Sequence, residues 1–305
     1  MNILIIGLGS IGKRHVRALQ TLLSSPRIFA LRSSENPDTI QGVINIFTLE
    51  EGLMQKIDFA IISNPTCEHK KTLIELIRYG FPLFIEKPLF SSLDLENIIE
   101  QVKSKNIISY VACNLRFLSC ITFIKDFLQS NNDKLLNEVN VYCGSYLPEW
   151  RQGINYRKIY SANADQGGGV HLDLIHELDY LYWIFGKPTQ VNRYFKNKSS
   201  LGISSIDYAN YLLDYNKFCV SLILNYYRRD SKRSMELIFE DKTILVDLLN
   251  NSVICNSEVI FSSPDRIADT YILQMEYFLK TIHEKTISFN TVNEAFEVLK
   301  ICLGK

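Results

Sequence analysis

Three glycines near the N-terminus form the pattern with the clearest chemical meaning. They lie in the segment Gly7-Leu8-Gly9-Ser10-Ile11-Gly12, between a short apolar run and the start of a predicted helix. Glycines at this spacing permit a tight turn, close approach of the backbone to a pyrophosphate and close packing of helix on strand, while the helix N-terminus contributes N–H donors. We therefore predict a dinucleotide site contacted by Gly7, Gly9, Ser10, Ile11 and Gly12.

The end of the second apolar run bears on which dinucleotide is bound. An acidic residue there would bind the ribose hydroxyls of NAD, but the sequence is Ala30-Leu31-Arg32-Ser33-Ser34. A guanidinium with hydroxyls beside it suits a 2′-phosphate, so Arg32 and Ser33 favour NADP over NAD. In the alternative interpretation, Arg32 stacks on the adenine and Glu35 reaches the ribose. Arg14 and His15, on the first helix, are expected to be solvated or packed rather than chemical.

Ionisable residues on a predicted helix over Val170–Phe185 can supply acid–base chemistry. Hydride transfer between a secondary alcohol and a nicotinamide needs a base for the hydroxyl proton and a positive group near the developing alkoxide. At ~100° per residue, Asp173, His176 and Tyr180 share one face, away from the apolar stripe. That stripe consists of Leu174, Leu178, Leu181 and Phe185. The alternative is that His176 is a surface histidine beside a carboxylate.

These residues must be positioned by the strands and helices around them. Over residues 1–118, strand and helix patterns alternate strictly, which predicts a doubly wound parallel sheet. The predicted strands are Ile3–Ile6, Ile28–Leu31, Phe59–Ser63, Pro82–Ile85 and Ile107–Ala112, and the predicted crossover helices are Thr66–Tyr79 and Leu93–Lys105. The fold class is therefore α/β for this N-terminal, Rossmann-type domain.

The pattern changes after Phe117, and we predict a second, α+β domain over residues 119–305 with a large, mostly antiparallel open sheet. A helix (Ile121–Gln129), a strand (Glu138–Tyr146) and an irregular loop (Leu147–Gln166) precede the helix with His176. The later predicted strands lie near 190–198, 206–214, 218–227, 234–240 and 244–249, followed by helices near 266–283 and 291–302. The basic run Arg228–Arg233 is interpreted as a solvated hairpin turn, with a contact to the phosphate of a nucleotide sugar as the alternative.

Composition excludes several classes of partner. The 33 basic and 33 acidic residues leave no net field to attract nucleic acid or an anionic membrane. The seven cysteines include no C-x-x-C pair, which argues against a disulfide framework and against a zinc site, and no metal is expected. With no signal-peptide pattern at the start and no apolar run near ~18 residues, a cytoplasmic location is expected.

Further segments make the chain resemble the glucose-fructose oxidoreductase / inositol dehydrogenase (Gfo/Idh/MocA) family over essentially its whole length. They are Ser63-Asn64-Pro65-Thr66, Glu86-Lys87-Pro88, Asn114-Leu115-Arg116-Phe117 and Gly167-Gly168-Gly169-Val170 leading into Asp173 and His176. The resemblance implies hydride transfer at a carbinol or carbonyl carbon of a sugar, cyclitol or derivative. It also implies a homodimer or homotetramer formed through the C-terminal sheet.

The resemblance assigns roles to individual residues. Lys87 would contact the nicotinamide side and the reacting hydroxyl, its direction set by Pro88 in a cis bond, and His176 would be the base. The family spacing is Asp-x-x-x-His, whereas Asp173 and His176 here have two intervening residues, which makes the role of Asp173 less secure. Additional cofactor contacts are expected from Ser63, Asn64, Pro65, His69, Glu86 and Lys87, and substrate contacts from Arg116, Asp173, His176 and Tyr180.

The loop before the His176 helix interleaves aromatic and basic residues and is interpreted as a substrate wall. Trp150 and Tyr156 offer flat faces to a sugar ring, and Arg151 or Arg157 can clamp a carboxylate or phosphate. A dimer contact is the main alternative, and single-stranded nucleic acid is a weaker one. The loop and the short Asp-x-x-His resemble a branch that handles sugars for surface polysaccharides.

Two other functions remain open at this point. The chain can be a non-catalytic protein that senses a dinucleotide or sugar, although such a sensor needs neither Lys87 nor His176. It can also be a lyase or glycosidase that retains its cofactor and oxidises the substrate only transiently.

Overall fold

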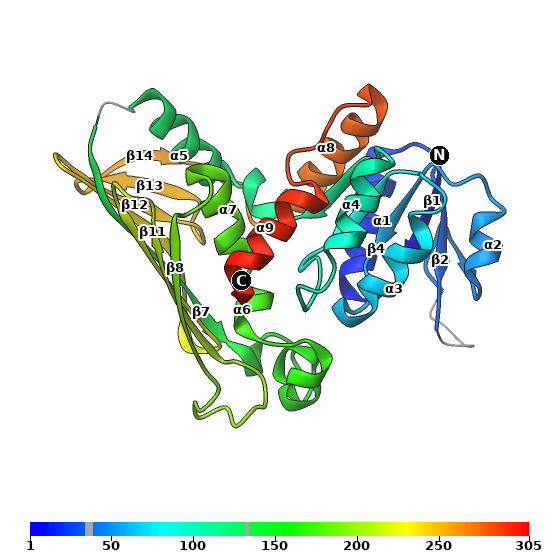
Figure 1. The fold of residues 1–305 in the computed structure, drawn as a ribbon, viewed down its shortest axis with the longest axis horizontal. Helices are drawn as coiled ribbons and strands as arrows, with labels where there is room; N and C mark the ends of the chain where they lie inside the picture. The colour runs from blue at the N-terminus through cyan, green and yellow to red at the C-terminus, as the bar shows by residue number, and fades with distance from the viewer. Residues whose placement is uncertain (34–38, 132–133, 305) are drawn as a thin grey trace. The chain divides into compact units, whose positions relative to one another are not determined.

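A computed structural model describes residues 1–33, 39–131 and 134–304 (Figure 1). The chain divides into two compact units, the first comprising Met1–Cys113 and Tyr271–Leu299 and the second Asn114–Thr270 and Lys300–Lys305. Residues 271–299 therefore group with the N-terminal unit, whereas the sequence analysis placed them in the C-terminal domain.

The first unit contains a six-stranded sheet in the order β3-β2-β1-β4-β5-β6, in which all neighbours are parallel. This is the Rossmann order, whose direction reverses between β1 and β4, and the predicted α/β fold is confirmed. Its strands are β1 (Asn2–Ile6), β2 (Arg27–Leu31), β3 (Val43–Ile46), β4 (Phe59–Ile62), β5 (Leu83–Glu86) and β6 (Ser109–Ala112).

Helices cover this sheet, and their bounds differ by a few residues from the predicted ones. They are α1 (Ser10–Leu22), α2 (Leu49–Leu53), α3 (Thr66–Leu76), α4 (Glu96–Ser104) and α8 (Thr270–Glu284), while α9 (Val292–Leu303) begins in the first unit and ends in the second. The sequence analysis did not include β3 or α2. Both are short, and β3 alternates exposed and buried positions instead of forming a continuous apolar run, so its pattern is weak.

Aromatic packing explains why α8 groups with the first unit. The ring of Phe278 lies 5.4 Å from Phe59 and 5.3 Å from Phe84, in edge-to-face geometry. The neighbouring Tyr277 contacts Tyr110 of β6 at 5.8 Å. Phe278 is fully buried. The apolar stripe of α8 is visible in the sequence, but the sheet that the stripe covers is not.

The second unit contains an eight-stranded sheet in the order β14-β13-β12-β11-β7-β10-β9-β8. Every pair of neighbours is antiparallel except β7 and β10, so the predicted mostly antiparallel sheet is confirmed. Its strands are β7 (Leu136–Tyr146), β8 (Gln190–Lys196), β9 (Tyr208–Asp214), β10 (Cys219–Asn225), β11 (Tyr227–Phe239), β12 (Thr243–Asp247), β13 (Ser252–Cys255) and β14 (Glu258–Ser262).

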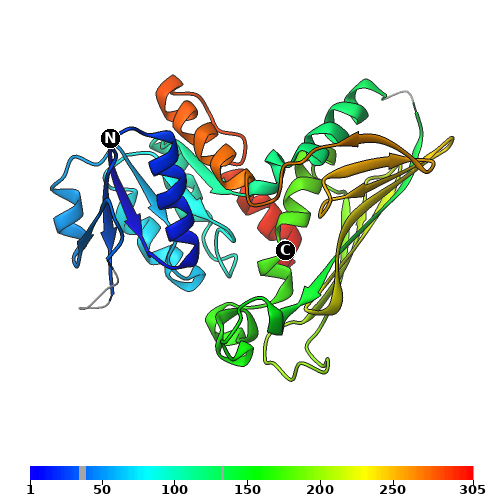
Figure 2. The ribbon, with the colours of Figure 1, turned by 180° about the vertical axis from the view of Figure 1, so that it is seen from behind.

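One face of this sheet is covered and the other is open (Figures 1 and 2). Helices α5 (Ser119–Ser130), α6 (Val170–Asp173) and α7 (His176–Phe185) lie on the covered face. Along β9, Tyr211 and Leu213 are buried while Leu212 between them is 46% exposed. Because side chains alternate across a strand, this pattern places the apolar set toward the helices. In the described part of the chain no helix covers the opposite face.

The prediction that Arg228–Arg233 forms a hairpin turn is wrong. These residues lie within β11, and β11 pairs with β7 rather than with the preceding β10, with a register shift between Tyr227 and Lys232. Arg228 and Lys232 lie over the ring of Tyr142, at 5.0 and 5.6 Å from its centroid. Basic side chains stacked on tyrosines can stay at the surface of a strand, so a run of charges here does not mark a turn.

Within residues 1–33, 39–131 and 134–304, no helix has the length and apolar character to cross a bilayer.

Truncating Phe278 tests which sheet α8 stabilises. Phe278→Ala should cost roughly 3–5 kcal/mol, because a fully buried aromatic ring is replaced by a cavity. Hydrogen exchange should accelerate in peptides that contain β4 and β5. The control is Ile272→Ala in the same helix, whose side chain is 37% exposed and should cost less than about 0.5 kcal/mol. Faster exchange in β9 and β10 instead would contradict the grouping of α8 with the first unit.

Candidate functional site

The carboxyl ends of four neighbouring strands place the predicted cofactor residues in one row. Ile6 of β1 pairs with both Leu31 of β2 and Ile62 of β4, and Ile62 pairs with Ile85 of β5. The residues that follow these positions are Gly7, Arg32, Ser63 and Glu86. Doubly wound sheets bind ligands at this edge, where the strand order reverses. The row therefore brings together four segments that are far apart in the sequence.

The turn after β1 has no room for side chains at two of its glycines. Gly7 has φ +90°, and a Cβ there would lie 2.5 Å from the backbone of Asn64. A Cβ on Gly12 would lie 2.5 Å from the carbonyl oxygen of Gly7. A Cβ on Gly9, in contrast, would meet no heavy atom within 4 Å. The first and third glycines thus permit loop and helix packing, while the second faces open space, as close approach of a pyrophosphate requires.

Helix α1 begins at Ser10, one residue before the predicted start at Ile11, with Gly9 as its N-cap. No side chain caps its first turn, and that turn contains no acidic residue. The N–H donors of this turn and the positive end of the helix dipole suit an anion such as a pyrophosphate. Ser63 donates a hydrogen bond to the Gly7 carbonyl at 2.7 Å and so holds the turn from the β4 side.

Arg32 follows β2 at the same edge of the sheet. Its backbone N–H donates to the carbonyl of Ile46 at 2.9 Å, and its guanidinium lies 3.4 Å from the side-chain oxygen of Asn45 on β3. Ser33 is exposed beside it. The edge therefore carries a cation where the acid of an NAD site would lie. Glu35, the alternative ribose ligand, lies outside the described residues.

His69, predicted to contact the cofactor, instead joins two loops of the site. It is 1% exposed, and its two ring nitrogens lie 3.1 Å from the carbonyl oxygen of Leu89 and 3.0 Å from that of Asn64. Burial lowers the pKa of His69. A side chain this buried acts by positioning the Asn64 loop against the segment after Lys87. Pro65 precedes α3 as its N-cap and is exposed.

Glu86 is likewise occupied within the protein. Its carboxylate lies 2.6 Å from Nε2 of His15, which is fully buried on α1. The pair links the end of β5 to the helix that begins at the glycine turn, so His15 is packed, which was one of its two expected states. Lys87 follows, half-buried, and its bond to Pro88 is cis, as the resemblance implied.

In the second unit, the predicted helix over Val170–Phe185 is wrong as a single element. It divides into α6, ending at Asp173, and α7, beginning at His176. The intervening turn is tightened, because the Ile175 and Glu177 N–H groups donate to carbonyls three residues back. A uniform ~100° per residue therefore does not apply across the break, and Asp173 does not share a helix face with His176.

The carboxylate of Asp173 is held by two tyrosines that the sequence analysis did not identify as its partners. Tyr160 donates to Oδ1 at 2.6 Å and Tyr226 donates to Oδ2 at 2.5 Å. Burial, together with the Asp173 charge, raises the pKa of both tyrosines, so both hydroxyls remain donors. Tyr160 lies in the loop that was singled out as a substrate wall, but nothing in the sequence pairs Tyr226 with Asp173. Asp173 thus anchors the loop to α6.

His176 is the first residue of α7 and is 9% exposed. Two other predicted substrate contacts are not available for that role. Tyr180 is fully buried, and Arg116 is 2% exposed and forms a bidentate ion pair with Asp179 at 2.7 and 2.8 Å. A buried pair of this kind must stay intact, because removing one partner leaves an uncompensated charge. We therefore remove Arg116 and Tyr180 from the candidate substrate site.

The loop Leu147–Gln166, interpreted as a substrate wall and called the wall loop below, contains four predicted substrate contacts. These four residues differ in their surroundings. Trp150 is 38% exposed, donates to the Ser145 hydroxyl at 2.9 Å and contacts Tyr226 edge-on. Arg151 is exposed. Tyr156 and Arg157 both donate to the carbonyl oxygen of Leu201, at 3.0 and 3.1 Å. Trp150, Arg151 and Arg157 are exposed, and Tyr156 and Arg157 fasten the loop to the segment between β8 and β9.

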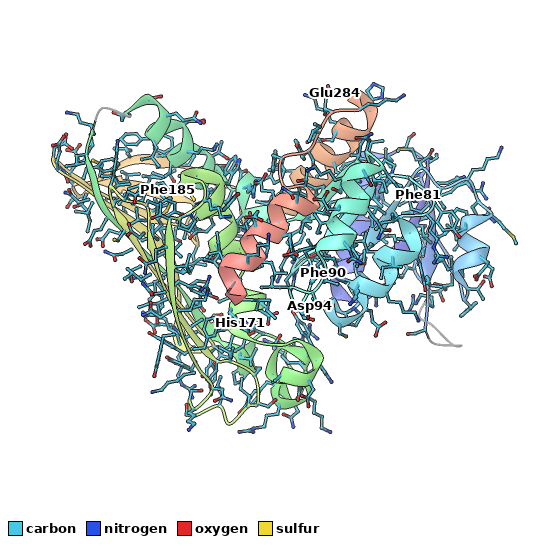
Figure 3. The ribbon with its side chains drawn as sticks, viewed as in Figure 1. Phe81, Phe90, Asp94, His171, Phe185 and Glu284 are labelled. Atoms are coloured by element: carbon cyan, nitrogen blue, oxygen red, sulfur yellow. The ribbon has the colours of Figure 1, made fainter. Side chains whose placement is uncertain are left out.

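His171 on α6 is a buried ionisable group that the sequence analysis passed over (Figure 3). It is 5% exposed, and its ring lies 5.2 Å from that of Phe195. Burial lowers the pKa of His171 to about 4, and the nearby Asp173 carboxylate offsets only part of this effect. The imidazole is therefore neutral at physiological pH. In the described ranges no group of three or more His, Cys, Asp or Glu residues could hold a metal ion.

Comparison with known proteins agrees with this geometry. Residues 1–113 match the family described as "Oxidoreductase family, NAD-binding Rossmann fold" (GFO_IDH_MocA). A curated relative, 2,7-anhydro-N-acetylneuraminate hydratase of Mediterraneibacter gnavus, is 25% identical over 191 residues, 60% of this chain and 48% of the relative. The match thus spans about half the length of that protein. The predicted resemblance to the Gfo/Idh/MocA family is confirmed.

Solved structures share the fold over nearly the whole chain. UDP-N-acetylglucosamine 3-dehydrogenase of Acidithiobacillus ferrooxidans is 18% identical, with 99% of this chain and 95% of that chain covered and a TM-score of 0.79. For myo-inositol 2-dehydrogenase of Lactobacillus plantarum the identity is 19%, the coverage 99% and 95%, and the TM-score 0.80. Levoglucosan dehydrogenase in complex with NADH is 17% identical, with 99% of this chain and 95% of that chain covered and a TM-score of 0.85. At these identities the likeness establishes the fold alone.

The lowered pKa of His171 predicts an acid-labile second unit. Between pH 6.5 and 4 the unfolded chain binds a proton at this histidine and the folded chain does not, so stability falls as pH falls. The loss at pH 5 should be about 2 kcal/mol, and His171→Gln should remove it. The measurement is urea unfolding at pH 7 and pH 5, followed by tryptophan fluorescence, because Trp150 and Trp183 both lie in the second unit.

His283→Gln is the matched control, since His283 is exposed and its replacement should leave the pH dependence unchanged. If His171→Gln lost as much stability between pH 7 and pH 5 as the native protein does, another group would be the cause of the pH dependence.

Proposed function

Because the chain resembles the Gfo/Idh/MocA oxidoreductases, we propose that it transfers a hydride between a nicotinamide dinucleotide and a secondary alcohol or carbonyl carbon of a sugar or sugar derivative. The observation that carries the proposal is the row of strand ends in the first unit. There the glycine turn, Arg32 and Lys87 follow β1, β2 and β5, whose carboxyl ends lie at one edge of the sheet.

The residues at this edge fit a dinucleotide. The open position at Gly9 and the uncapped first turn of α1 would hold the pyrophosphate. Arg32 and Ser33 would hold a 2′-phosphate, so NADP is the favoured form and NAD the alternative. Ser63 and Asn64, fixed by the Gly7 carbonyl and by Thr72, would line the nicotinamide side. When bound, the dinucleotide would supply the carbon that accepts or donates the hydride.

We assign the electrostatic part of the reaction to Lys87. An ammonium group near the substrate oxygen stabilises the negative charge that develops there as the hydroxyl proton leaves. Glu86 precedes Lys87, but its carboxylate is engaged by His15 and is therefore not assigned a contact with substrate. His15 and His69 hold the segment from two sides and so act as positioning residues.

We assign proton transfer to His176, which would take the hydroxyl proton on an imidazole nitrogen in the oxidative direction and return it in the reductive one. Asp173 would act one step further away. Its two oxygens hold Tyr160 and Tyr226, so it would set the position of the wall loop. Trp150 and Arg151 would then contact the sugar ring and any acidic substituent.

The names of the relatives support a saccharide or cyclitol substrate. The proposed role in surface-polysaccharide sugar metabolism rests on the wall loop and the short Asp-x-x-His spacing. The similarity to the hydratase favours a second candidate function. In that reaction the substrate would be oxidised transiently to permit elimination or hydration, and the hydride would then return to it. The same residues would serve, but no reduced dinucleotide would accumulate. A sensor without catalysis remains less favoured, because both Lys87 and His176 are present.

Replacing the proposed catalytic pair tests these roles. Lys87→Ala and His176→Ala should each lower kcat about 100-fold or more, because charge stabilisation and proton transfer are lost. The dissociation constant for the dinucleotide should change less than about threefold. The assay is reduction of NADP or NAD with a panel of polyols and sugars that includes myo-inositol and levoglucosan, with His283→Gln as the control.

Full activity of both variants would overturn the assigned roles. Tight dinucleotide binding by the native protein with no conversion of any panel member would favour the sensor, and conversion without accumulation of reduced dinucleotide would favour the hydratase-type reaction.

Replacing Arg32 tests the choice of dinucleotide. Arg32→Ala should weaken NADPH binding by about 10–100-fold, the range expected for loss of charge-assisted hydrogen bonds to a phosphate, and should leave NADH binding within about twofold. Equilibrium fluorescence titration with each dinucleotide measures both constants. Arg27→Ala, at the exposed start of the same strand, is the control. An equal loss of affinity for NADPH and NADH would mean that Arg32 contacts the adenosine that the two dinucleotides share.

A further inference from the structure

Tyr226 is a fully buried residue between β10 and β11 whose contacts converge on the wall loop. Its backbone carbonyl accepts a hydrogen bond from the N–H of Leu147, the first residue of that loop, at 2.8 Å. Its ring lies 5.3 Å from that of Trp150, with the two ring planes at 89°. Its hydroxyl donates to Oδ2 of Asp173. One residue therefore contacts the start of the wall loop, its exposed indole and the carboxylate that anchors it.

Two contacts hold the indole of Trp150. Its Nε1–H donates to the hydroxyl of Ser145 on β7 at 2.9 Å, and its ring meets that of Tyr226 in edge-to-face geometry. Aromatic pairs prefer this arrangement because the positive edge of one ring faces the negative face of the other. Since the one polar atom of the indole is already bonded, the exposed part of Trp150 is a flat apolar surface. Such a surface can stack on the C–H face of a sugar or cyclitol ring.

The hydroxyl of Tyr226 acts on a second point of the wall loop through Asp173. This carboxylate is 4% exposed and accepts hydrogen bonds from Tyr226 on one oxygen and from Tyr160 on the other, at 2.5 and 2.6 Å. Hydrogen bonds to a charged acceptor are stronger than those between neutral groups. Because Tyr160 and Trp150 both belong to the wall loop, Tyr226 and Asp173 together hold that loop at two separate points.

The position of Tyr226 itself is set by the second sheet. The residue joins the end of β10 to the start of β11, and its backbone N–H donates to the carbonyl of Asp207 at 3.1 Å. The regular elements of the wall loop, in contrast, are 3-10 helices of three residues each. Short 3-10 turns have poor hydrogen-bond geometry, so the loop depends on contacts from outside to keep one conformation. Residues held by a rigid sheet can provide that support.

We propose that Tyr226 is a positioning residue that sets the affinity for the saccharide by holding Trp150 as a fixed, apolar stacking surface. The proposal rests on the redox function proposed above. The ring of Tyr226 would fix the orientation of the indole, and its hydroxyl would hold Tyr160 through Asp173. Tyr226 is fully buried and would not contact the substrate. The substrate would present a face of C–H bonds to Trp150 and would need no hydrogen bond from the indole.

Hydrogen exchange of the full chain without ligand tests the positioning. Tyr226→Phe keeps the ring and loses only the hydroxyl, so exchange in peptides of the wall loop should accelerate about fivefold or more. Tyr160→Phe removes the other donor to Asp173 and should act in the same direction. The matched control is Tyr211→Phe. It removes the hydroxyl of another fully buried tyrosine of the same sheet, which donates to the Cys302 carbonyl at 3.2 Å, and should leave exchange in the wall loop unchanged.

Steady-state kinetics with the panel of polyols and sugars separates this role from a general loss of structure. Tyr226→Phe should raise KM about tenfold or more, as loss of a hydrogen bond to a charged group does, and should change kcat less than about threefold, because Lys87 and His176 are intact. Tyr226→Leu, which also removes the ring beside Trp150, should raise KM further. Trp150→Phe retains a flat face and should keep KM within about threefold, whereas Trp150→Ala should raise KM about tenfold.

Unchanged exchange of the wall loop in Tyr226→Phe, or equal acceleration in Tyr211→Phe, would overturn the proposal. A fall in kcat at constant KM in Tyr226→Phe would overturn it as well. Equal increases of KM in Trp150→Phe and Trp150→Ala would mean that the substrate needs the indole N–H, which contradicts the apolar stacking surface. No conversion of any panel member by the native protein would count against the redox proposal alone, because the exchange rates are measured without substrate or dinucleotide.

Discussion

The approach of two backbones at the centre of the first sheet is the constraint on which the nucleotide site depends. The turn after β1 and the start of the loop after β4 lie so close that Gly7 has no space for a Cβ against Asn64, and Gly12 has none against Gly7. This contact aligns the N-terminus of α1 with the reversal of strand order. Because neighbouring parallel strands are in register, Arg32 and Glu86 then follow at the same edge. A larger residue at either glycine would displace the helix end that is proposed to bind the pyrophosphate.

Buried polar pairs hold the segments around that edge. His15 engages Glu86 from α1, and His69 spans the carbonyls of Asn64 and Leu89, so the segment with Lys87 is fixed from both sides. Buried polar pairs hold the second unit in the same way. Asp173 accepts hydrogen bonds from two tyrosine hydroxyls, and Arg116 forms an ion pair with Asp179. Each carboxylate has specific donors, which offsets the cost of burying its charge. Several groups that look chemical in the sequence therefore serve to position their neighbours.

The second sheet separates two kinds of surface. Its covered face carries the helices with His171 and His176, and its open face carries tyrosines with lysines and arginines stacked on them. Stacking helps these cations remain at a strand surface, and Arg228 is also paired with Asp230 at 2.6 Å. The loop between β8 and β9 fastens the wall loop through Leu201.

The sequence alone determined the class of both units, the glycine turn and the order of elements. It could do so because most first-unit strands are continuous apolar runs, and because glycines at this spacing between a strand and a helix are typical of a dinucleotide-binding turn. Only tertiary structure decided which groups are left for chemistry. Tyr226 lies 53 positions from Asp173, and no periodicity reveals that the two meet. Arg116 and Tyr180 were expected at the substrate, but packing of α7 against the sheet buries them. Local pattern fixes what an element is, whereas its partners depend on contacts between residues far apart in the chain, as β11 pairing with β7 and α8 covering the first sheet both demonstrate.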